Sequence, residues 1–145
     1  MFSQDFREFI ELLIKNKAEY LIVGGYAVGV HGHPRYTGDL DIWLNSTKKN
    51  AELILKTVNE FGFSSFKLTP ADFTKPGNII QLGYPPLRID LLTEIDGVTF
   101  AACFANRKEV VIEKLKVNFI GYNDLLKNKK ESGRPRDIDD IDNLQ

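Results

Sequence analysis

The chain has 145 residues, of which 43% are hydrophobic and 27% charged, values typical of a soluble globular protein that buries a real core. A formal net charge of −1 provides no overall field to recruit nucleic acid or an anionic membrane, and the single cysteine, Cys103, excludes an intramolecular disulfide and a cysteine-rich zinc site. The amino terminus carries charges within its apolar pattern, unlike a signal peptide, and the longest apolar run, residues 20–30, is too short to cross a bilayer. We therefore expect one domain over residues 1–145, located in the cytoplasm and not in a membrane.

The first half of the chain predicts helices that alternate with strands. Apolar residues at helical spacing open the pattern, and the pair Gly24 and Gly25 stops the first short apolar strand. A later helix is expected to be capped by Asn45 or Ser46 and to end at Gly62. The expected elements are helices over residues 6–14, 26–30 and 48–61, and strands over residues 20–23 and 39–44.

The second half predicts further strands and two closing helices. Residues 98–120 are ambiguous: a short helix over residues 100–105 is expected, followed by the strand-like stretches KEVVIEKL and KVNFIG. Strands mixed with helices through short connections indicate an α/β or α+β domain. The remaining expected elements are strands over residues 63–68, 78–82 and 88–92, and helices over residues 123–132 and 137–144.

Three aspartates interrupt strands that are otherwise apolar. Asp39 and Asp41 lie one residue apart in GDLDIW, so their side chains point to the same face of the strand, and their repulsion requires a cation or water nearby. In RIDLLT, Asp90 shares a strand face with Arg88, and the three carboxylates converge if the two strands are neighbours in one sheet. Hard oxygen ligands favour Mg²⁺ or Mn²⁺ over zinc, so the pattern predicts a divalent cation held by Asp39, Asp41 and Asp90.

The glycine pair predicts the other half of the same site. A strand, then Gly24–Gly25, then a helix start form a backbone that phosphate oxygens can approach closely, because glycine lacks Cβ and a helix amino terminus favours anions. Two common phosphate-binding patterns are absent: no Gly-Lys-Ser/Thr end is present, and GGYAVG does not supply G-x-G-x-x-G.

In this order, GGYAVGVHGHPRYTGDLDIW and the later RIDLL resemble the nucleotidyltransferase superfamily that includes DNA polymerase β. More narrowly, they resemble the small MNT-type and AbiEii-toxin-related enzymes of bacteria and archaea. In that superfamily a Gly-Gly or Gly-Ser pair starts a helix, an Asp-x-Asp strand follows, and a third acid lies on a later strand. The resemblance implies a small mixed β-sheet with flanking helices. The matching positions here are Gly24, Gly25, Asp39, Asp41 and Asp90.

Further positions of the resemblance lie before the acid pair and in the closing helices. Arg35 and Thr37 match residues that support the triphosphate, and Lys129 with Arg136–Asp137 matches a lysine followed by a basic-Asp pair. In this interpretation Lys129 binds phosphate while Asp137 orients it. The residues themselves leave alternatives open: Arg35 can instead neutralise the acid pair, the third acid can be an ordinary exposed strand residue, and the tail aspartates can simply favour a helix amino terminus.

The resemblance implies an enzyme that moves a nucleoside monophosphate from an NTP, ATP among the candidates, to an acceptor hydroxyl and releases pyrophosphate. Asp39 and Asp41 would hold both Mg²⁺ ions, and Asp90 would ligate the catalytic ion and help to deprotonate the acceptor. Many relatives carry an added helical domain, and this chain shows none. The acceptor is therefore expected on a partner, a HEPN-type protein in a toxin–antitoxin pair, with an RNA tail or a small molecule as further candidates.

Two other functional classes remain as alternatives. One is a binding protein, an antitoxin or interaction module, that keeps the fold without turnover, against which the intact acid pair argues. The other is a nucleic-acid-binding module, which has little support at a net charge of −1 without a face that combines aromatic and basic residues.

Overall fold

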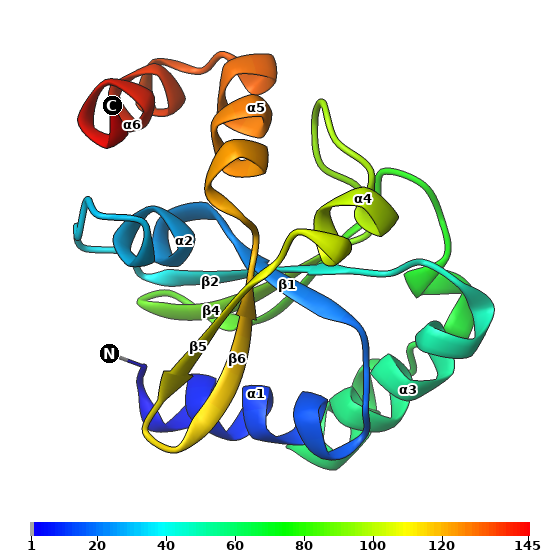
Figure 1. Ribbon diagram of the computed structural model, residues 1–145. Coiled ribbons are helices and arrows are strands. Elements are labelled where there is room, and N and C mark those ends of the chain that lie inside the picture. Colours follow the sequence, from blue (N-terminus) through cyan, green and yellow to red (C-terminus); the bar gives the residue numbers. More distant parts are fainter. Residues whose placement is uncertain (1) are drawn as a thin grey trace.

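The computed structural model describes residues 2–145 and builds them around one six-stranded sheet (Figure 1). The strand order is β3-β4-β2-β1-β6-β5, with both parallel and antiparallel neighbours, which confirms the expected mixed sheet. The strands are β1 (Tyr20–Val23), β2 (Asp39–Leu44), β3 (Ile79–Tyr84), β4 (Leu87–Leu92), β5 (Lys108–Ile112) and β6 (Leu115–Phe119).

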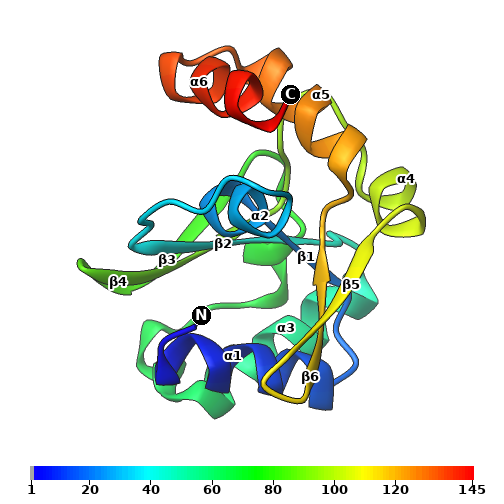
Figure 2. The same ribbon diagram turned by 60° about the vertical axis from the view of Figure 1, so that its left-hand side comes forward.

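Helices cover both faces of this sheet. In the view of Figure 1, α1 and α3 lie below the sheet while α2, α5 and α6 lie above it, and Figure 2 shows the same two layers from another side. No helix within residues 2–145 is both long and apolar enough to cross a membrane. The helices are α1 (Gln4–Lys15), α2 (Gly24–Val30), α3 (Lys48–Val58), α4 (Phe100–Ala105), α5 (Tyr122–Ser132) and α6 (Pro135–Leu144), with short helical turns η1 (Asn59–Phe63), η2 (Ser64–Phe66) and η3 (Pro70–Phe73).

Helix α1 shows how the apolar spacing becomes packing. Ser3 caps it, its hydroxyl oxygen accepting a hydrogen bond from the N–H of Phe6 at 3.2 Å. Helical spacing places Phe6, Phe9 and Leu13 on one face, and all three are buried in the core. Full burial of each such side chain stabilises the fold by about 1.5–3 kcal/mol.

The central strands set the register that matters for function. β1 is buried along its whole length, and its last residue, Val23, lies opposite Asp41 of the antiparallel strand β2. β2 and β4 run parallel, with Asp41 directly beside Asp90 and Asp39 directly beside Arg88. The chain after β1 therefore turns into α2 next to the acidic positions.

Most expected elements are confirmed. The strands over residues 20–23 and 39–44 and the helix over residues 100–105 match the structure at both ends, and the stretches KEVVIEKL and KVNFIG contain β5 and β6. The two closing helices are confirmed as well, although each begins one or two residues earlier than expected.

The expected strand over residues 63–68 is wrong. This stretch forms helical turns, η1 into η2, in which the ring of Phe63 packs against Phe61 and Phe66 with centroids 5.6 and 5.0 Å apart. Gly62 has a φ of 110°, which turns the chain so that these three rings meet. Packing among these aromatic rings accompanies the helical turns that replace the expected strand.

The expected cap of α3 is also wrong. Thr47, rather than Asn45 or Ser46, caps this helix, and its hydroxyl oxygen accepts a hydrogen bond from the N–H of Asn50 at 3.3 Å. The side chain of Asn45 instead donates to the carboxylate of Glu19 at 2.8 Å, so it is occupied elsewhere.

Candidate functional site

The three aspartates lie together on one face of the sheet. Asp39 and Asp41 come from β2, and their positions two apart put both side chains on the same side of the strand. Asp90 comes from the neighbouring strand β4 and is the register partner of Asp41. It is buried, whereas the two acids of β2 are half-buried.

The cation beside these three acids is Arg88, which lies on β4, the strand that carries Asp90. The guanidinium of Arg88 binds Asp90 through two hydrogen bonds, Nε to Oδ1 at 2.8 Å and Nη2 to Oδ2 at 3.0 Å. Its Nη2 also donates to Oδ2 of Asp39 at 3.0 Å. The hydrogen bond with Asp90 raises the pKa of Arg88, so the guanidinium stays positively charged. Sequence reasoning placed Arg88 on the face of Asp90 but gave it no part in the site.

Asp41 is the acid that Arg88 leaves without a direct partner. Burial, reinforced by repulsion from Asp90 and then Asp39, raises the pKa of Asp41 to about 7. Lys129 and Arg88 are near enough to oppose this rise but do not cancel it. Close to neutral pH this carboxyl group is therefore able both to hold and to release a proton.

The donor set suits a hard divalent cation, but Arg88 occupies part of it. Three carboxylates on two adjacent strands provide the oxygen ligands that Mg²⁺ and Mn²⁺ prefer. The side chains of residues 2–145 form no group of three or more His, Cys, Asp or Glu arranged to hold a metal ion, and the guanidinium of Arg88 binds both Asp39 and Asp90. The expected ligand geometry thus requires Arg88 to move.

The glycine pair lies against these acids. Gly24 has a φ of 67°, and a Cβ at this position would overlap the carboxylate of Asp41. A Cβ on Gly25 would lie 2.7 Å from Oγ1 of Thr37 and 3.4 Å from Nη1 of Arg35. Both glycines are therefore required by the protein's own packing, whether or not phosphate approaches them.

The closing helices bring a buried ionic network to the same face. Lys129 of α5 is 5% exposed, and its Nζ lies 3.2 Å from Oδ1 of Asp137 and 3.0 Å from Oδ2 of Asp140, both on α6 and each 1% exposed. Arg136 is exposed, and it is Arg134 that binds Asp137, through Nε at 2.8 Å. The structure thus joins Lys129 to Asp137, the pair that the resemblance implies, and adds a second acid.

Asp140 also holds Arg35. Nε and Nη2 of this arginine donate to the two oxygens of Asp140, each at 3.1 Å. Arg35 therefore neutralises an aspartate of the tail and not the pair in β2. Sequence reasoning missed Asp140, although its spacing of three residues from Asp137 places both on one face of a helix.

The two tail aspartates remain ionised despite their burial. Burial alone would raise the pKa of Asp137, but hydrogen bonds from Arg134, Ser132 and Lys129 outweigh it and lower the pKa to about 2. For Asp140, hydrogen bonds from Arg35 and Lys129 likewise outweigh burial and lower the pKa. Both carboxylates are thus fixed negative charges at neutral pH.

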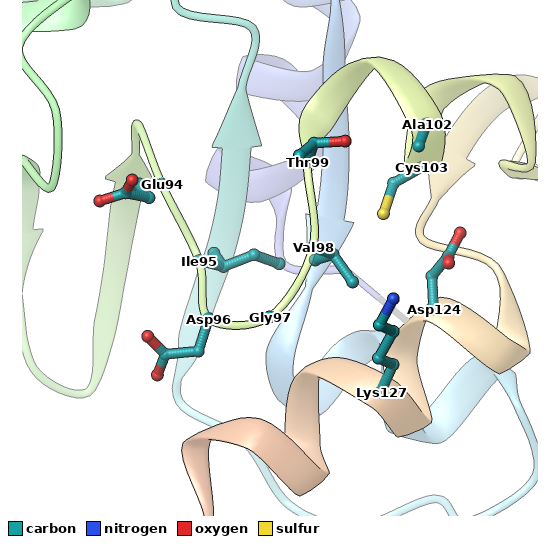
Figure 3. A pocket seen from close by; sticks show the side chains of 10 residues that line it. All are labelled: Glu94, Ile95, Asp96, Gly97, Val98, Thr99, Ala102, Cys103, Asp124 and Lys127. Carbon is teal, nitrogen blue, oxygen red and sulfur yellow. The ribbon is translucent and has the colours of Figure 1, made fainter.

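A cavity of about 580 Å³ lies beyond the carboxyl end of β4, as Figure 3 shows. It is lined by the loop Glu94–Thr99, by α4 and by α5, and none of the predicted site residues lines it. The thiol of Cys103 lies at its wall, and burial raises its pKa to about 12, so this cysteine is no nucleophile.

Comparison with known proteins supports one class. The family described as "Nucleotidyltransferase of unknown function (DUF6036)" matches residues 4–145. Among curated proteins, none matches this sequence.

Three solved structures share the fold at low identity. A Thermotoga maritima protein, TM1012, described as a candidate nucleotidyltransferase, has a TM-score of 0.63 at 13% identity, over 94% of this chain and 88% of that one. The lincosamide antibiotic adenylyltransferase LnuA, bound to lincomycin, has a TM-score of 0.58 at 16% identity, over 99% and 96%. An antigenic nucleotidyltransferase-like protein from Paracoccidioides brasiliensis has a TM-score of 0.55 at 15% identity, over 97% and 74%.

Substitution Gly25→Ala tests the packing at the glycine pair. The added Cβ would meet Thr37, so we expect a loss of roughly 1–3 kcal/mol in the free energy of unfolding, as for other overpacked sites. The loss should shrink when Gly25→Ala is made in a Thr37→Gly background, since the opposing atoms are then gone. Urea unfolding of the four proteins in this cycle measures the coupling, and additive losses would contradict the contact.

The raised pKa of Asp41 predicts a pH-dependent stability. The folded state binds a proton that the unfolded chain, with a pKa near 3.8, has already lost, so stability should fall as pH rises from about 4 to 7. The contribution of this one group has a slope of at most about 1.4 kcal/mol per pH unit. Asp41→Asn should flatten the profile measured by urea unfolding in EDTA, whereas Asp142→Asn, on the exposed face of α6, should not. Parallel profiles for wild type and Asp41→Asn would refute the assignment.

Proposed function

Since the chain belongs to the family of nucleotidyltransferases of unknown function that matches residues 4–145, we propose that it transfers a nucleoside monophosphate from an NTP to an acceptor hydroxyl and releases pyrophosphate. The observation that carries the proposal is the parallel pairing of β2 with β4. This pairing sets Asp41 beside Asp90, with Asp39 on the same face and Gly24 against Asp41.

In this proposal Asp39, Asp41 and Asp90 hold Mg²⁺ or Mn²⁺. The unpartnered carboxylate of Asp41 and the positive charge already seated between Asp39 and Asp90 support such a site. When bound, the metal would polarise the phosphate oxygens and neutralise the charge that develops during transfer. The remaining tasks belong to the protein itself.

The protein's own residues would bind the triphosphate and manage one proton. Arg35 presents Nη1 toward Gly25, and the positive charge of Lys129 opposes the rise in the pKa of Asp41, which supports a role for both cations in binding the triphosphate. In the present arrangement both oxygens of Asp90 accept hydrogen bonds from Arg88. Asp90 can accept the proton of the acceptor hydroxyl only after Arg88 has released the carboxylate of Asp90.

The same ion pairs favour one alternative, a binding module without turnover. If Arg88 never leaves Asp39 and Asp90, the chain binds nucleotide through its cations and performs no transfer. The two candidates differ in a single measurable property, which is whether label from an NTP becomes covalently attached to anything.

For the acceptor, we propose a hydroxyl on a partner protein, of the HEPN type in a toxin–antitoxin pair, as the first candidate. A small molecule is the second, and the lincomycin-bound adenylyltransferase LnuA supports it, because a protein that this chain covers to 96% is described as acting on an antibiotic. An RNA tail is the third candidate.

Metal binding should depend on the acids and be limited by Arg88. We expect Mn²⁺ to raise the melting temperature of the wild type, because a ligand selective for the native state stabilises it by mass action. Asp39→Asn with Asp41→Asn should abolish this rise. Arg88→Met should lower the melting temperature without metal and tighten Mn²⁺ binding, measured by calorimetry, by roughly tenfold, or about 1.4 kcal/mol.

Arg136→Met serves as the matched control, since Arg136 is exposed and lies outside the cluster. An unchanged Mn²⁺ response in the double aspartate variant would place the metal elsewhere. Equal Mn²⁺ affinity in Arg88→Met and wild type would show that the guanidinium does not compete with the metal.

Transfer itself is tested with each of the four NTPs labelled at the α-phosphate, Mg²⁺ and a lysate of the native host. We expect label on a protein band with wild type, and a loss of roughly a hundredfold or more with Asp41→Asn, because phosphoryl transfer depends almost entirely on positioning and charge stabilisation. Label in the small-molecule or RNA fraction instead would replace the partner-protein acceptor. Nucleotide binding without any covalent label would favour the binding module.

A further inference from the structure

Asp140 makes contacts that anchoring a terminal helix does not require. Its two oxygens accept hydrogen bonds from Nε and Nη2 of Arg35, each at 3.1 Å, and Oδ2 also lies 3.0 Å from Nζ of Lys129. Arg35 comes from the loop between α2 and β2, and Lys129 comes from α5. One carboxylate, 1% exposed, thus joins two cations from separate segments.

Helix α6 has a different anchor. Asp137 closes its amino terminus, where Oδ2 accepts hydrogen bonds from Ser132 at 2.6 Å and from Nε of Arg134 at 2.8 Å. The N–H of Arg134 adds a further hydrogen bond to the same oxygen at 3.3 Å. Nζ of Lys129 is shared between the two acids, since it also lies 3.2 Å from Oδ1 of Asp137, but the contacts of Asp140 with Arg35 are separate from those that start the helix.

The geometry at Arg35 is directional. With Nε and Nη2 held by Asp140, the remaining terminal nitrogen, Nη1, lies 3.4 Å from the position that a Cβ on Gly25 would occupy. A two-point contact fixes the plane of a guanidinium, whereas a single contact lets it rotate. The free edge of Arg35 is therefore presented to the glycine turn.

We propose that Asp140 is the positioning residue for triphosphate binding, because it holds Arg35 toward the glycine turn. The inference rests on the proposed function, since it assigns Arg35 to the triphosphate of the NTP. Its physical basis is preorganisation: side chains that are already fixed lose less conformational freedom when a ligand binds. A carboxylate that touches no substrate thereby determines how tightly the substrate binds.

The test uses inorganic tripolyphosphate with Mg²⁺, a probe that does not depend on the base of the nucleotide. Calorimetry with Asp140→Asn should give an affinity at least about tenfold weaker than wild type. Asp139→Asn, which makes the same charge change on the exposed side of the same helix, should stay within about twofold. The rise in melting temperature on adding Mn²⁺ alone should be the same in all three proteins, because the acids on β2 and β4 are untouched.

Unchanged tripolyphosphate affinity in folded Asp140→Asn overturns the inference, and so does a parallel loss of the Mn²⁺ response, which would mean general structural damage. If Asp140→Asn does not fold, Asp140→Glu keeps the charge but shifts the carboxylate by one methylene. It must then weaken tripolyphosphate binding while preserving the Mn²⁺ response. Wild type that binds neither tripolyphosphate nor any NTP removes the proposed function itself, and the inference with it.

Discussion

Mutual repulsion among carboxylates is the constraint around which this sheet is organised. Parallel pairing of β2 with β4 sets Asp41 beside Asp90, and the pleat keeps Asp39 on the same side. Arg88, the preceding residue on the same face of β4, forms ion pairs with Asp39 and Asp90. Asp41 has no such ion pair with Arg88, and its pKa is raised. Buried like charges of this kind cost stability, and such arrangements cluster at functional sites. Gly24 follows from the same crowding, because a Cβ at this position would overlap the carboxylate of Asp41.

A second set of charges, contributed mainly by the closing helices, lies on the same face as the three acids of β2 and β4. Lys129, Asp137 and Asp140 are almost fully buried, and Arg35 completes their network. Taking these ions out of water is expensive, and a purely apolar contact between α5 and α6 would often stabilise as well or better. Unlike an apolar contact, the ionic network fixes the positions of two cations, Arg35 and Lys129. The fold therefore gives up some stability, and in return the buried ions create a defined electrostatic field on the face of the sheet covered by α2, α5 and α6.

Several of these features could be predicted from the sequence, and the reasons differ from residue to residue. The period of two along a strand sufficed to put Asp39 and Asp41 on one face, and helical spacing sufficed for the apolar face of α1. Asp90 required the further condition that its strand be a neighbour of β2, which only the resemblance to a family made plausible. The role of Arg88 depends on the same pairing, and no local pattern assigns it. Asp140 was missed because its partner Arg35 lies 105 residues away. The turns over residues 63–66 were missed because ring packing among Phe61, Phe63 and Phe66 is a tertiary contact that the local sequence does not reveal.

The ion pair between Arg35 and Asp140 joins the first third of the chain to its last helix. A nascent chain emerges from its amino terminus at about 5–20 residues per second, so α2, β2 and the acid-bearing part of β4 are available before α6 exists. During that interval Asp39, Asp41, Asp90 and Arg88 have been synthesised, while the carboxylate that holds Arg35 has not. Contacts this distant along the chain are intrinsically slow to form. The ion pair between Arg35 and Asp140, 105 residues apart, therefore forms only after α6 has been synthesised.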